Sequence, residues 1–556
     1  MPGEFRVDGT LPDVYAPLAR DLSASPEKVT AFFPRPPASP QAWRERAAEL
    51  ADLWAEPEAR ARRAHVVTTL TAWHEDLGCH AAQRRNLEAL AAEDAMVVVT
   101  GQQPGLLGGP LFCLYKALGA VRMAAAASEV LGRPVVPVFW VASEDHDWSE
   151  VSRARLAGPG GEVVSLRLPG AGDFRSAGTI QVPPEARHMV GELESIFPPT
   201  PAGAPFAAML RGSLQGTGRL TLAGWFTAQW QALLGARGLL FYDPMLPGLR
   251  SAAAPIFAGA AEHSAAASEA IRDMGVRVRA AGYTPGLDLE PDHVHLFVYH
   301  QGRRLSLHRE GGRIRTKGGE VDLSPAELGH RAALDPAGFS PNVALRPIVQ
   351  DFTLPVLAQL GGPGEVAYLA QLGPVFALWG RRAPLVAMRP GCTLLLPEDQ
   401  AALGTAGVSV AELRQDAVAA IERAAAAGSP ADLDAALAGA RAAVDAAYVA
   451  LGRELAPISP HMPGIVRGNA ERVRYQLDYL ERKARQHRRR AQGELVTGLR
   501  AANGRLFPGG GPQERSSLAW PYLYRWGAAF LDALADALGS PASFGQHQLL
   551  TWRDAP

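Results

Sequence analysis

The sequence predicts an α/β protein built on a doubly wound parallel sheet and followed by a long helical segment. Apolar runs at 95–100 and 134–142 are typical of buried strands, and the segment from about 110 to 130 between them has a helical pattern. A strand, a helix and a strand within about 45 residues form a parallel crossover, the unit of a doubly wound sheet. From about residue 409 to 500, long helices replace this alternation.

Length and composition restrict the classes of function. A chain of 556 residues is too long for one core and predicts two or three domains. The net charge of −1 provides no basic field for nucleic acid, so small molecules or a second copy of the chain are the expected partners. Three distant cysteines, Cys79, Cys113 and Cys392, without any CxxC pair argue against a disulfide framework or a thiolate zinc site and fit a reducing cytosol.

The sequence also gives no sign of membrane targeting. The first residues lack a charged segment followed by an apolar one, and no uninterrupted apolar stretch approaches the length of a membrane span. We therefore expect a cytoplasmic protein without a membrane partner.

The order of the elements predicts insertions into the sheet domain. Short β-like runs with glycine and proline breaks occupy 152–200, Gly238–Asp243 has the pattern of another parallel strand, and alternation at His293–Tyr299 begins a second β-rich stretch. The predicted organisation is a helical lead-in (1–94), the first part of the sheet domain (95–151), a first insertion (152–221), a continuation of the sheet domain (222–274), a β-rich second insertion (275–340), the second part of the sheet domain (341–400), a helical coiled coil (401–510) and a C-terminal helical segment (511–556).

Two helical patterns between 409 and 500 predict an antiparallel hairpin or coiled coil. Apolar residues recur at steps of four and three from Leu433 to Leu451 and again from Val466 to Ala491, and prolines separate the two stretches. Because many seam positions are alanines that bury little, we expect a second copy of the chain to complete the core as a homodimer. The alternative is a hairpin packed on the chain's own sheet domain. A basic cluster at 482–490 could contact phosphates, although such clusters are more often solvated faces.

A glycine-rich segment follows the first strand and predicts a ligand-binding loop. Glycines remove side chains that would block a ligand, and a helix beginning near Pro110 would offer unpaired N–H groups and a positive dipole end to an anion. The spacing matches neither Gly-x-Gly-x-x-Gly nor a Walker loop, so it identifies no nucleotide class, and an ordinary glycine-rich turn is the alternative. The candidate binding residues are Thr100, Gly101, Gln102, Gln103, Gly105, Gly108 and Gly109.

Lys116 lies in the helix that follows this segment. The chain has 55 Lys and Arg residues, and its other lysines are only Lys28, Lys317 and Lys483, so a lysine in this position is notable. A surface lysine on an amphipathic helix is the alternative. Cys113, in the same helix, has no surroundings that favour a nucleophile, and we expect it to be buried.

A polar cluster ends the second strand and consists of Ser143, Glu144, Asp145, His146 and Asp147. Ligands of doubly wound sheets bind at the carboxyl ends of strands, which places this cluster beside the glycine-rich segment. In an extended conformation Asp145 and Asp147 share one side and His146 faces the other, so only one or two of the residues act together. They could act as acid and base, hold an ammonium group or bind a divalent metal, although they lack the thiolates of a dedicated zinc site. The alternative is a capped turn of solvated carboxylates.

A second strand-to-helix junction lies at 360–371, and Arg346 precedes it as a candidate anion clamp. Three glycines again make backbone N–H groups available, and three polar residues follow at helical steps of three. We expect these three to share one face that binds an amine, a hydroxyl or an amide. The candidate binding residues are Gly361, Gly362, Gly364, Glu365, Tyr368 and Gln371.

Several strings of this sequence resemble the bacillithiol synthase (BshC) family of cysteine ligases. The resemblance implies a Rossmann core like that of class I aminoacyl-tRNA synthetases, two connecting-peptide insertions and a coiled coil that pairs subunits. It also implies the last step of bacillithiol synthesis, which joins cysteine to glucosaminyl-malate (GlcN-Mal) with ATP or another nucleotide as the energy source. The strings span almost the whole chain and are Thr100–Leu111 with Tyr115 and Lys116, Pro137–Asp147, Gly361–Glu365, Leu506–Pro508 and Pro512–Arg515.

The chemistry of such a ligase constrains the mechanism. An amide does not form from a free carboxylate and an amine, so the cysteine carboxylate must first become an adenylate or a phosphate. In this hypothesis the loop 101–109 holds one anionic ligand, and Asp145, His146 or Asp147 orients the sugar or deprotonates its amine. Lys116 or Arg346 neutralises developing charge. The requirement for a divalent metal is left open.

One departure from class I synthetases and two alternative functions stand beside this hypothesis. The His-Ile-Gly-His and Lys-Met-Ser-Lys-Ser signatures of class I synthetases are absent, so residue roles are not carried over from those enzymes. A non-catalytic dimeric scaffold that binds a nucleotide or sugar is one alternative function. A sugar transferase, which would use an activated sugar and no cysteine, is the other.

Overall fold

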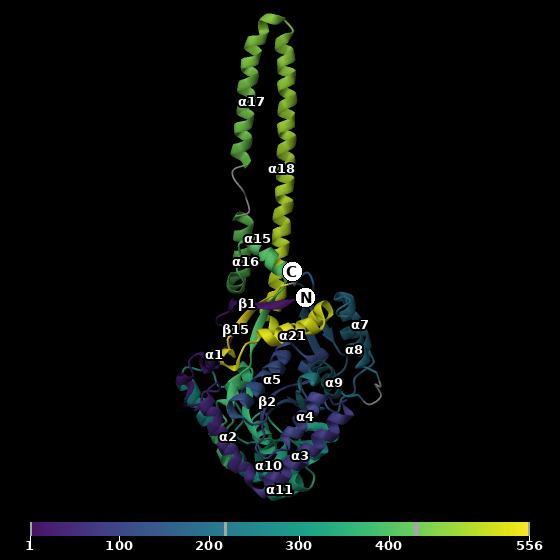
Figure 1. Ribbon diagram of the computed structural model, residues 1–556, viewed down its shortest axis with the longest axis vertical. Coiled ribbons are helices and arrows are strands. Elements are labelled where there is room, and N and C mark those ends of the chain that lie inside the picture. The colour runs from purple at the N-terminus through teal and green to yellow at the C-terminus, as the bar shows by residue number, and fades with distance from the viewer. Residues whose placement is uncertain (1–2, 216–219, 428–432, 554–556) are drawn as a thin grey trace. The chain divides into compact units, whose positions relative to one another are not determined.

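The computed structural model describes residues 3–215, 220–427 and 433–553, and the chain divides into two compact units (Figure 1). The first unit comprises Met1–Gly158, Val163–Leu394 and Gly511–Pro556, and the second comprises Pro159–Glu162 and Leu395–Gly510.

A five-stranded parallel sheet forms the centre of the first unit. Its strands are β2 (Met96–Gln102), β3 (Val135–Val141), β6 (Leu240–Tyr242), β12 (Val356–Gly361) and β13 (Leu385–Met388), in the order β13-β12-β2-β3-β6. Every neighbouring pair is parallel. The strands are almost entirely buried, as is usual where helices cover both faces of a parallel sheet. The doubly wound sheet predicted from the sequence is confirmed.

The strand order places a switch point between β2 and β12. The chain runs from β2 through β3 to β6 on one side and then crosses to β12 and β13 on the other. At this point Thr100 Oγ1 of β2 donates a hydrogen bond to the backbone oxygen of Leu360 in β12 (2.9 Å). In sheets of this kind ligands bind at the switch point, beyond the carboxyl ends of the strands.

Helices cover both faces of the sheet. Alternate residues of β2 point in opposite directions, so Val97 and Val99 pack with α3, α10 and α12, whereas Met96 and Val98 pack with α2 and α5. The helices of the first unit are α1 (Pro17–Ala24), α2 (Pro40–Ala55), α3 (Pro57–Asp76), α4 (Ala81–Leu90), α5 (Leu111–Leu131), α6 (Trp148–Val151), α7 (Glu185–Ile196), α8 (Ala204–Gly212), α9 (Leu222–Leu234), α10 (Pro247–Ala280), α11 (Pro325–Leu334), α12 (Arg346–Thr353), α13 (Pro363–Leu369), α14 (Gly373–Leu378), α19 (Gln513–Ser516), α20 (Trp520–Trp526) and α21 (Ala528–Ala537).

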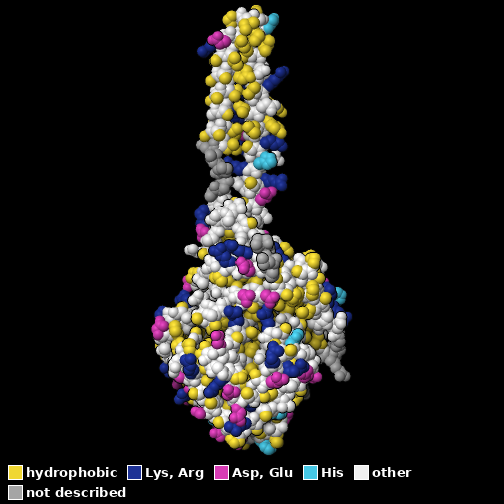
Figure 2. Space-filling model, in the orientation of Figure 1, with side chains coloured by type: hydrophobic (Ala, Val, Ile, Leu, Met, Phe, Trp, Pro, Cys, Tyr) yellow, Lys and Arg dark blue, Asp and Glu magenta, His cyan; other side chains and the backbone are white. Residues whose placement is uncertain are grey.

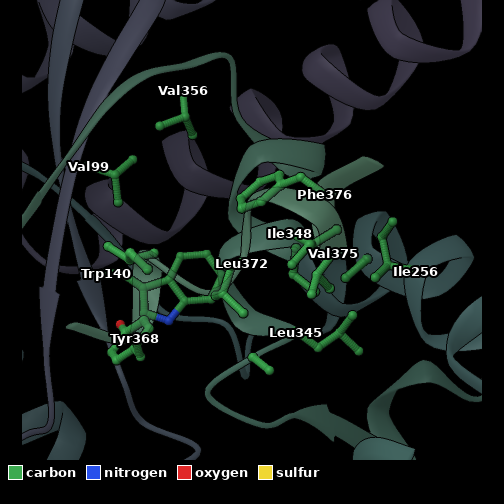
Figure 3. Packing of buried hydrophobic residues seen from close by; sticks show 14 of the residues in the cluster. Val99, Trp140, Ile256, Leu345, Ile348, Val356, Tyr368, Leu372, Val375 and Phe376 are labelled. Atoms are coloured by element: carbon green, nitrogen blue, oxygen red, sulfur yellow. The ribbon is translucent and has the colours of Figure 1, made fainter. Parts of the chain in front are cut away.

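The larger hydrophobic core holds the strands that carry the site. Val99 of β2, Trp140 of β3 and Val356 of β12 belong to one buried cluster with Ile348 of α12 and Phe376 of α14 (Figure 3). Burying one such side chain contributes about 1.5–3 kcal/mol. The ends of β2, β3 and β12 are therefore held on a rigid base.

Three further sheets lie outside the parallel sheet in the described residues, and two of them fall within the predicted insertions. One is a hairpin of β4 (Arg153–Ala157) and β5 (Val163–Arg167), and the other has the order β10-β9-β8-β7-β11 and is antiparallel. The second sheet consists of β7 (His293–His300), β8 (Arg303–Glu310), β9 (Arg313–Thr316), β10 (Asp322–Leu323) and β11 (Phe339–Pro341).

The structure corrects two details of the predicted insertions. The border at residue 275 falls inside α10, because the helical pattern continues to Ala280. Helix α7 occupies part of 152–200, where the sequence suggested short β-like runs, and α8 follows it within the predicted first insertion. The likeness to class I synthetases and their connecting peptides stays a prediction.

The helical predictions for 1–94 and 511–556 are each wrong at one strand. β1 (Glu4–Thr10) pairs antiparallel with β15 (His547–Arg553), and β15 also neighbours β14 (Gly391–Leu395). Because the partner of β1 is near the other end of the sequence, the local pattern carries little sign of this pairing.

The second unit is helical and consists of α15 (Pro397–Ala406), α16 (Val410–Ala427), α17 (Leu433–Leu455) and α18 (Met462–Leu506). Helices α17 and α18 run side by side in opposite directions (Figure 1). Arg441 of α17 pairs with Asp478 of α18 (2.7 Å), and Asp445 pairs with Arg474 (2.7 Å). The predicted antiparallel hairpin is confirmed.

Two helices, Leu111–Leu131 and Leu433–Ile458, have the length and mean hydropathy of a membrane span. The first is α5, most of which is buried in the sheet domain, and the second includes α17 with its ion pairs to α18. Charged residues interrupt both helices, Lys116 and Arg122 in the first and Arg441 and Asp445 in the second, so neither is an uninterrupted apolar stretch. The absence of a membrane partner stays a prediction.

Candidate functional site

Polar side chains gather at the carboxyl edge of the parallel sheet. Gln102 ends β2, Glu144 follows β3, Asp243 follows β6, Glu365 follows β12 and Arg389 follows β13. Each strand therefore contributes a polar residue to the edge at which ligands of this fold bind.

Lys116 and Glu365 meet at the switch point. Lys116 Nζ forms an ion pair with Glu365, and it donates hydrogen bonds to the backbone oxygen of Gly101 (2.7 Å) and to Gln102 Oε1 (2.9 Å). Burial lowers the pKa of Lys116, and the negative charge of Glu365 opposes that shift. Lys116 is only 2% exposed, so the alternative of a surface lysine is wrong.

A chain of side-chain hydrogen bonds joins this ion pair to the polar cluster after β3. Gln102 Oε1 accepts from Lys116, and Gln102 Nε2 donates to Gln103 Oε1 (3.0 Å). Gln103 Nε2 in turn donates to Asp145 Oδ2 (2.9 Å). Five residues predicted separately for the site, Lys116, Glu365, Gln102, Gln103 and Asp145, therefore form one network across β12, β2 and β3.

The N-terminus of α5 differs from the predicted phosphate cradle. The N–H of Leu111 donates to the backbone oxygen of Ser517 (2.7 Å), and the indole N–H of Trp520 donates to that of Leu107 (2.9 Å). Residues 517–520 therefore bind the segment on which the sequence predicts an anion. The prediction is corrected here, because the first N–H group of the helix is used within the chain.

The glycines of this segment have structural reasons of their own. Gly108 and Gly109 have φ angles of +80° and +74°, which side chains rarely allow. A Cβ on Gly101 would lie 2.7 Å from the backbone oxygen of Trp140, and one on Gly105 would lie 3.0 Å from Gly109 Cα. Together with Thr100 in β2, these glycines shape the loop. Cys113 is fully buried, as predicted, and burial raises the pKa of its thiol to about 12.

The cluster after β3 is a turn, so the predicted extended geometry is wrong. Asp145 Oδ1 accepts the N–H of Asp147 (2.8 Å), and Asp147 Oδ1 accepts the N–H groups of Ser149 (2.9 Å) and Glu150 (3.3 Å) at the start of α6. Asp147 is thus an exposed N-cap. Asp145 is half-buried and remains in the network with Gln103.

Glu144 and Ser143 point into the protein. Glu144 forms an ion pair with Arg250 of α10 (2.7 Å), and Ser143 Oγ donates to Asp243 after β6. Burial raises the pKa of Glu144, against the effect of Arg250 and Arg304. Within the described residues, no group of metal-binding side chains converges at 143–147.

Two arginines at this edge lack a carboxylate partner within ion-pair distance in the described part of the chain. Arg304 of β8 donates to His146 Nδ1 (3.0 Å) and to Ser340 Oγ (2.7 Å), and its guanidinium lies over the Phe297 ring. Arg346 of α12 donates to the hydroxyl of Tyr368. Burial and the charge of Arg304 lower the pKa of His146. Because Nδ1 accepts from Arg304, the neutral ring carries its proton on Nε2, which weakens the prediction of His146 as a base.

The junction at 360–371 divides into two parts. Gly362 N–H donates to Glu365 Oε2 (2.9 Å), so Glu365 caps α13 while it binds Lys116. Gln371 lies beyond the end of α13, and its amide bonds the N–H (2.8 Å) and the carbonyl (3.1 Å) of Leu287. The prediction that Gln371 shares a binding face with Glu365 and Tyr368 is wrong, because the helix ends before it.

Arg389, which the sequence did not single out, completes this side. Its terminal nitrogens bond both carboxylate oxygens of Glu514 (2.9 and 2.6 Å). Its Nε is buried without a hydrogen-bond partner in the described structure. A Cβ on Gly362 would lie 3.5 Å from that Nε, 3.6 Å from Glu365 Oε2 and 3.9 Å from Lys116 Cε. The bare backbone of Gly362 therefore leaves a small space among three charged side chains. Arg250, Arg304 and Arg389 gave no local signal, since arginine is the usual cation of this chain.

Comparison with known proteins covers almost the whole chain. Residues 10–390 match the family model "Bacillithiol biosynthesis BshC, N-terminal Rossmann-like domain". Residues 392–552 match the model "Bacillithiol biosynthesis BshC, C-terminal coiled-coil domain".

Relatives of similar length carry one name, "Putative cysteine ligase BshC". The chain is 32% identical to the protein of Symbiobacterium thermophilum over 495 residues, which cover 85% of this chain and 87% of the relative. It is 32% identical to that of Heliobacterium modesticaldum (81% and 82% covered) and 29% identical to that of Salinibacter ruber (97% and 96% covered). These matches agree with the resemblance of the sequence motifs and with the Rossmann-like sheet. The chain belongs to the BshC family, the cysteine ligases of bacillithiol biosynthesis.

Proposed function

We propose that this ligase joins the carboxyl group of cysteine to the amine of glucosaminyl-malate, after a nucleoside triphosphate such as ATP has activated the carboxylate. The observation that carries the proposal is the hydrogen-bonded network from Glu365 through Lys116, Gln102 and Gln103 to Asp145, at the switch point of the sheet. It connects a cationic region, formed by Lys116 and Arg389, with the carboxylate of Asp145, which can accept a proton.

The cationic region supports binding of phosphate and carboxylate oxygens. Lys116 and Arg389 approach the bare backbone of Gly362, and Arg389 Nε has a hydrogen that no described residue accepts. Positive charge placed in advance stabilises the negative charge that develops when a carboxylate oxygen attacks phosphorus. The attack forms an O–P bond, and pyrophosphate or ADP leaves.

The second region supports binding of the sugar-malate. Its malyl group carries two carboxylates, and Arg304 and Arg346 are two arginines at this edge whose described hydrogen bonds go to uncharged groups. Guanidinium groups bind carboxylates in forked geometry. In the second step the amine nitrogen attacks the acyl carbon, AMP or phosphate leaves, and Asp145 accepts the proton from nitrogen.

One assay tests the reaction and separates the two forms of activation. Purified protein is incubated with cysteine, glucosaminyl-malate and ATP, with and without Mg²⁺, and the products are quantified by mass spectrometry. Bacillithiol with an equal amount of AMP supports an adenylate, and bacillithiol with ADP supports an acyl phosphate. Binding of all three compounds without product would overturn the proposal and leave the scaffold alternative. Product formed from an activated sugar without cysteine would indicate a transferase.

A variant tests the assignment of the malyl group. Arg346→Ala is expected to raise the KM for glucosaminyl-malate at least about tenfold while the KM for cysteine changes little. An equal change in the two KM values would contradict the assignment.

We also propose that the α17–α18 hairpin pairs two copies of the chain. Its surface exposes apolar side chains along both helices (Figure 2), including Val449, Leu451, Ile465, Tyr475 and Leu480. Exposed apolar surface of this kind is typical of an interaction site. Light scattering on the purified protein is expected to give the mass of a dimer, and replacing Leu451 and Leu480 by Glu is expected to give the monomer. We expect the dimer to act in the cytoplasm.

A further inference from the structure

A second group of charged side chains lies on the antiparallel sheet, apart from the network described above. Glu290 and Asp292 precede β7, and His308 lies in β8. One donor atom from each residue lies within 4.8 Å of the other two. His308 Nδ1 is 3.6 Å from both Glu290 Oε2 and Asp292 Oδ2.

His308 directs an unused nitrogen at the two carboxylates. The residue is 6% exposed, and its Nδ1 is buried without a hydrogen-bond partner among the described residues. Its Nε2 is 2.9 Å from Ser306 Oγ, which holds the ring in place. A separation of 3.6 Å is too long for a hydrogen bond. The buried nitrogen therefore faces two anionic groups and bonds to neither.

The spacing fits a shared metal ion. Imidazole nitrogen and carboxylate oxygen bind Zn²⁺ at about 2.0–2.2 Å, and tetrahedral geometry then separates neighbouring ligand atoms by about 3.3–3.6 Å. We propose that Glu290, Asp292 and His308 form a binding site for a divalent transition-metal ion such as Zn²⁺, with water in the remaining position. The imidazole distinguishes the site from the all-oxygen sites of Ca²⁺ and Mg²⁺.

The backbone holds the ligands together before any ion binds. The N–H of Arg309, next to His308, donates to the backbone oxygen of Asp292 (2.7 Å). This bond fixes the loop before β7 against β8, so the metal would close a site that is already arranged. It would join the start of β7 to its neighbouring strand and stabilise the antiparallel sheet.

Lys317 is the competing cation. Its Nζ lies 2.9 Å from Glu290, and its side chain is 65% exposed. A metal ion must take Glu290 from this ammonium group, and the exposed lysine can turn into solvent. Removal of the lysine is therefore expected to tighten metal binding, a result that a purely structural ion pair does not predict.

Zinc binding to the full chain tests the proposal. The protein is stripped with a chelator, and Zn²⁺ is titrated in competition with a chromophoric chelator. We expect one equivalent to bind to the wild type, at least about tenfold weaker binding to Glu290→Gln and Asp292→Asn, and tighter binding to Lys317→Ala. Circular dichroism verifies that these surface variants remain folded.

A matched control and spectroscopy fix the location. Glu310→Gln changes an exposed carboxylate of the same hairpin that pairs with Arg315, and it is expected to bind zinc as the wild type does. X-ray absorption at the zinc edge is expected to show nitrogen and oxygen ligands without sulfur. The proposal is overturned if the wild type binds no zinc, or if it binds zinc that Glu290→Gln and Asp292→Asn leave unchanged.

Discussion

Lys116 of α5 and Glu365 of α13 form an ion pair although 249 positions separate them in the sequence. Because Lys116 is buried, replacing either residue alone by a neutral one leaves the other charge without its partner. Glu365→Gln is expected to cost roughly 2–3 kcal/mol of unfolding free energy, less than a fully buried pair because Glu365 is partly exposed. Denaturant unfolding measures this cost.

The double variant Lys116→Met with Glu365→Gln separates stability from catalysis. It removes both charges, so stability is expected to recover relative to Glu365→Gln, whereas ligase activity is expected to stay about 10²–10³-fold below the wild type. A double variant with normal activity would remove the ion pair from the mechanism.

Gly362→Ala is expected to block the site without disturbing the fold. The backbone of Gly362 has φ −80°, which alanine adopts, and the new methyl group would meet Arg389, Glu365 and Lys116 at ordinary contact distances. We expect at most about 1 kcal/mol of destabilisation and more than tenfold weaker nucleotide or cysteine binding by calorimetry. Gly364→Ala is the control, because a Cβ there meets nothing within 4 Å. Equal binding by the two variants would contradict the proposed site.

Asp145 and Asp147 are expected to respond differently to the same substitution. Asp145→Asn places an amide N–H₂ or a rotated carbonyl against Gln103 and removes the proton acceptor, so kcat/KM should fall about 10²-fold. Asp147→Asn keeps an N-cap, so activity and stability should change little. Steady-state kinetics on the two proteins decides this, and similar losses in both would contradict the assignment.

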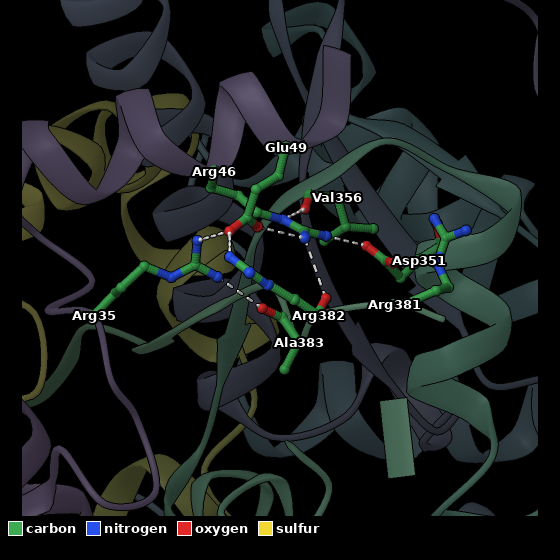
Figure 4. Close-up of polar contacts among 8 residues, drawn as sticks. All are labelled: Arg35, Arg46, Glu49, Asp351, Val356, Arg381, Arg382 and Ala383. Carbon is green, nitrogen blue, oxygen red and sulfur yellow. Dashed lines mark hydrogen bonds and ion pairs between the residues drawn. The ribbon is translucent and has the colours of Figure 1, made fainter. Parts of the chain in front are cut away.

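A buried network on the other side of the first unit is expected to control stability. Asp351 is fully buried and bonds Arg46 (2.5 Å) and Arg381 (2.5 Å), as Figure 4 shows. Asp351→Asn leaves two buried guanidinium groups without their carboxylate and is expected to cost about 3–5 kcal/mol. Arg382→Ala breaks only an exposed ion pair with Glu49 and is expected to cost less than about 1 kcal/mol. Urea unfolding of the two variants measures both losses of unfolding free energy.

Acid is expected to destabilise the antiparallel sheet through two histidines. Burial lowers the pKa of His293 to about 4, and nearby His308 contributes to this shift. Burial also lowers the pKa of His295 to about 3, and here His293 contributes. The unfolded chain binds these protons near pH 6.5 and the folded chain does not, so stability is fully present above pH 6.5 and falls as the pH falls toward 4. At His293 the carboxylates of Asp292 and Glu290 act against the lowering of the pKa, and the positive charge of Lys317 lowers the pKa further.

His295→Asn tests the pH dependence. Asparagine tolerates the φ of +65° at this position, so the backbone is kept while the titrating ring is removed. The free energy of unfolding between pH 7 and 4 should fall less steeply than in the wild type. The exposed His330→Asn is the control and should keep the wild-type slope.

The sequence predicted those parts of the site that depend on local pattern. Valine runs and glycine junctions identified β2, β3 and β12, and the ends of parallel strands necessarily meet at one edge. Lys116 was identified by contrast with the arginines around it. The network with Gln103 and Asp145 required side-chain positions that no spacing determines.

Three corrections at the site share a physical cause, because each comes from a contact between distant segments. The N–H of Leu111 is satisfied by Ser517, and Gln371 leaves its predicted face to bond Leu287. Arg304 reaches His146 from another sheet. A periodic pattern describes the neighbours of a residue along its own element and cannot specify such partners.

The bonds from Ser517 and Trp520 to the loop at Leu107 and Leu111 also determine when the site is completed. Ribosomes make the chain from its N-terminus, so the parallel strands and α5 leave the ribosome long before residues 514–520. Until then the loop beside the ion pair lacks its cover, and Arg389 lacks Glu514. A nascent chain therefore acquires its parallel sheet early and the contacts that complete its candidate site late.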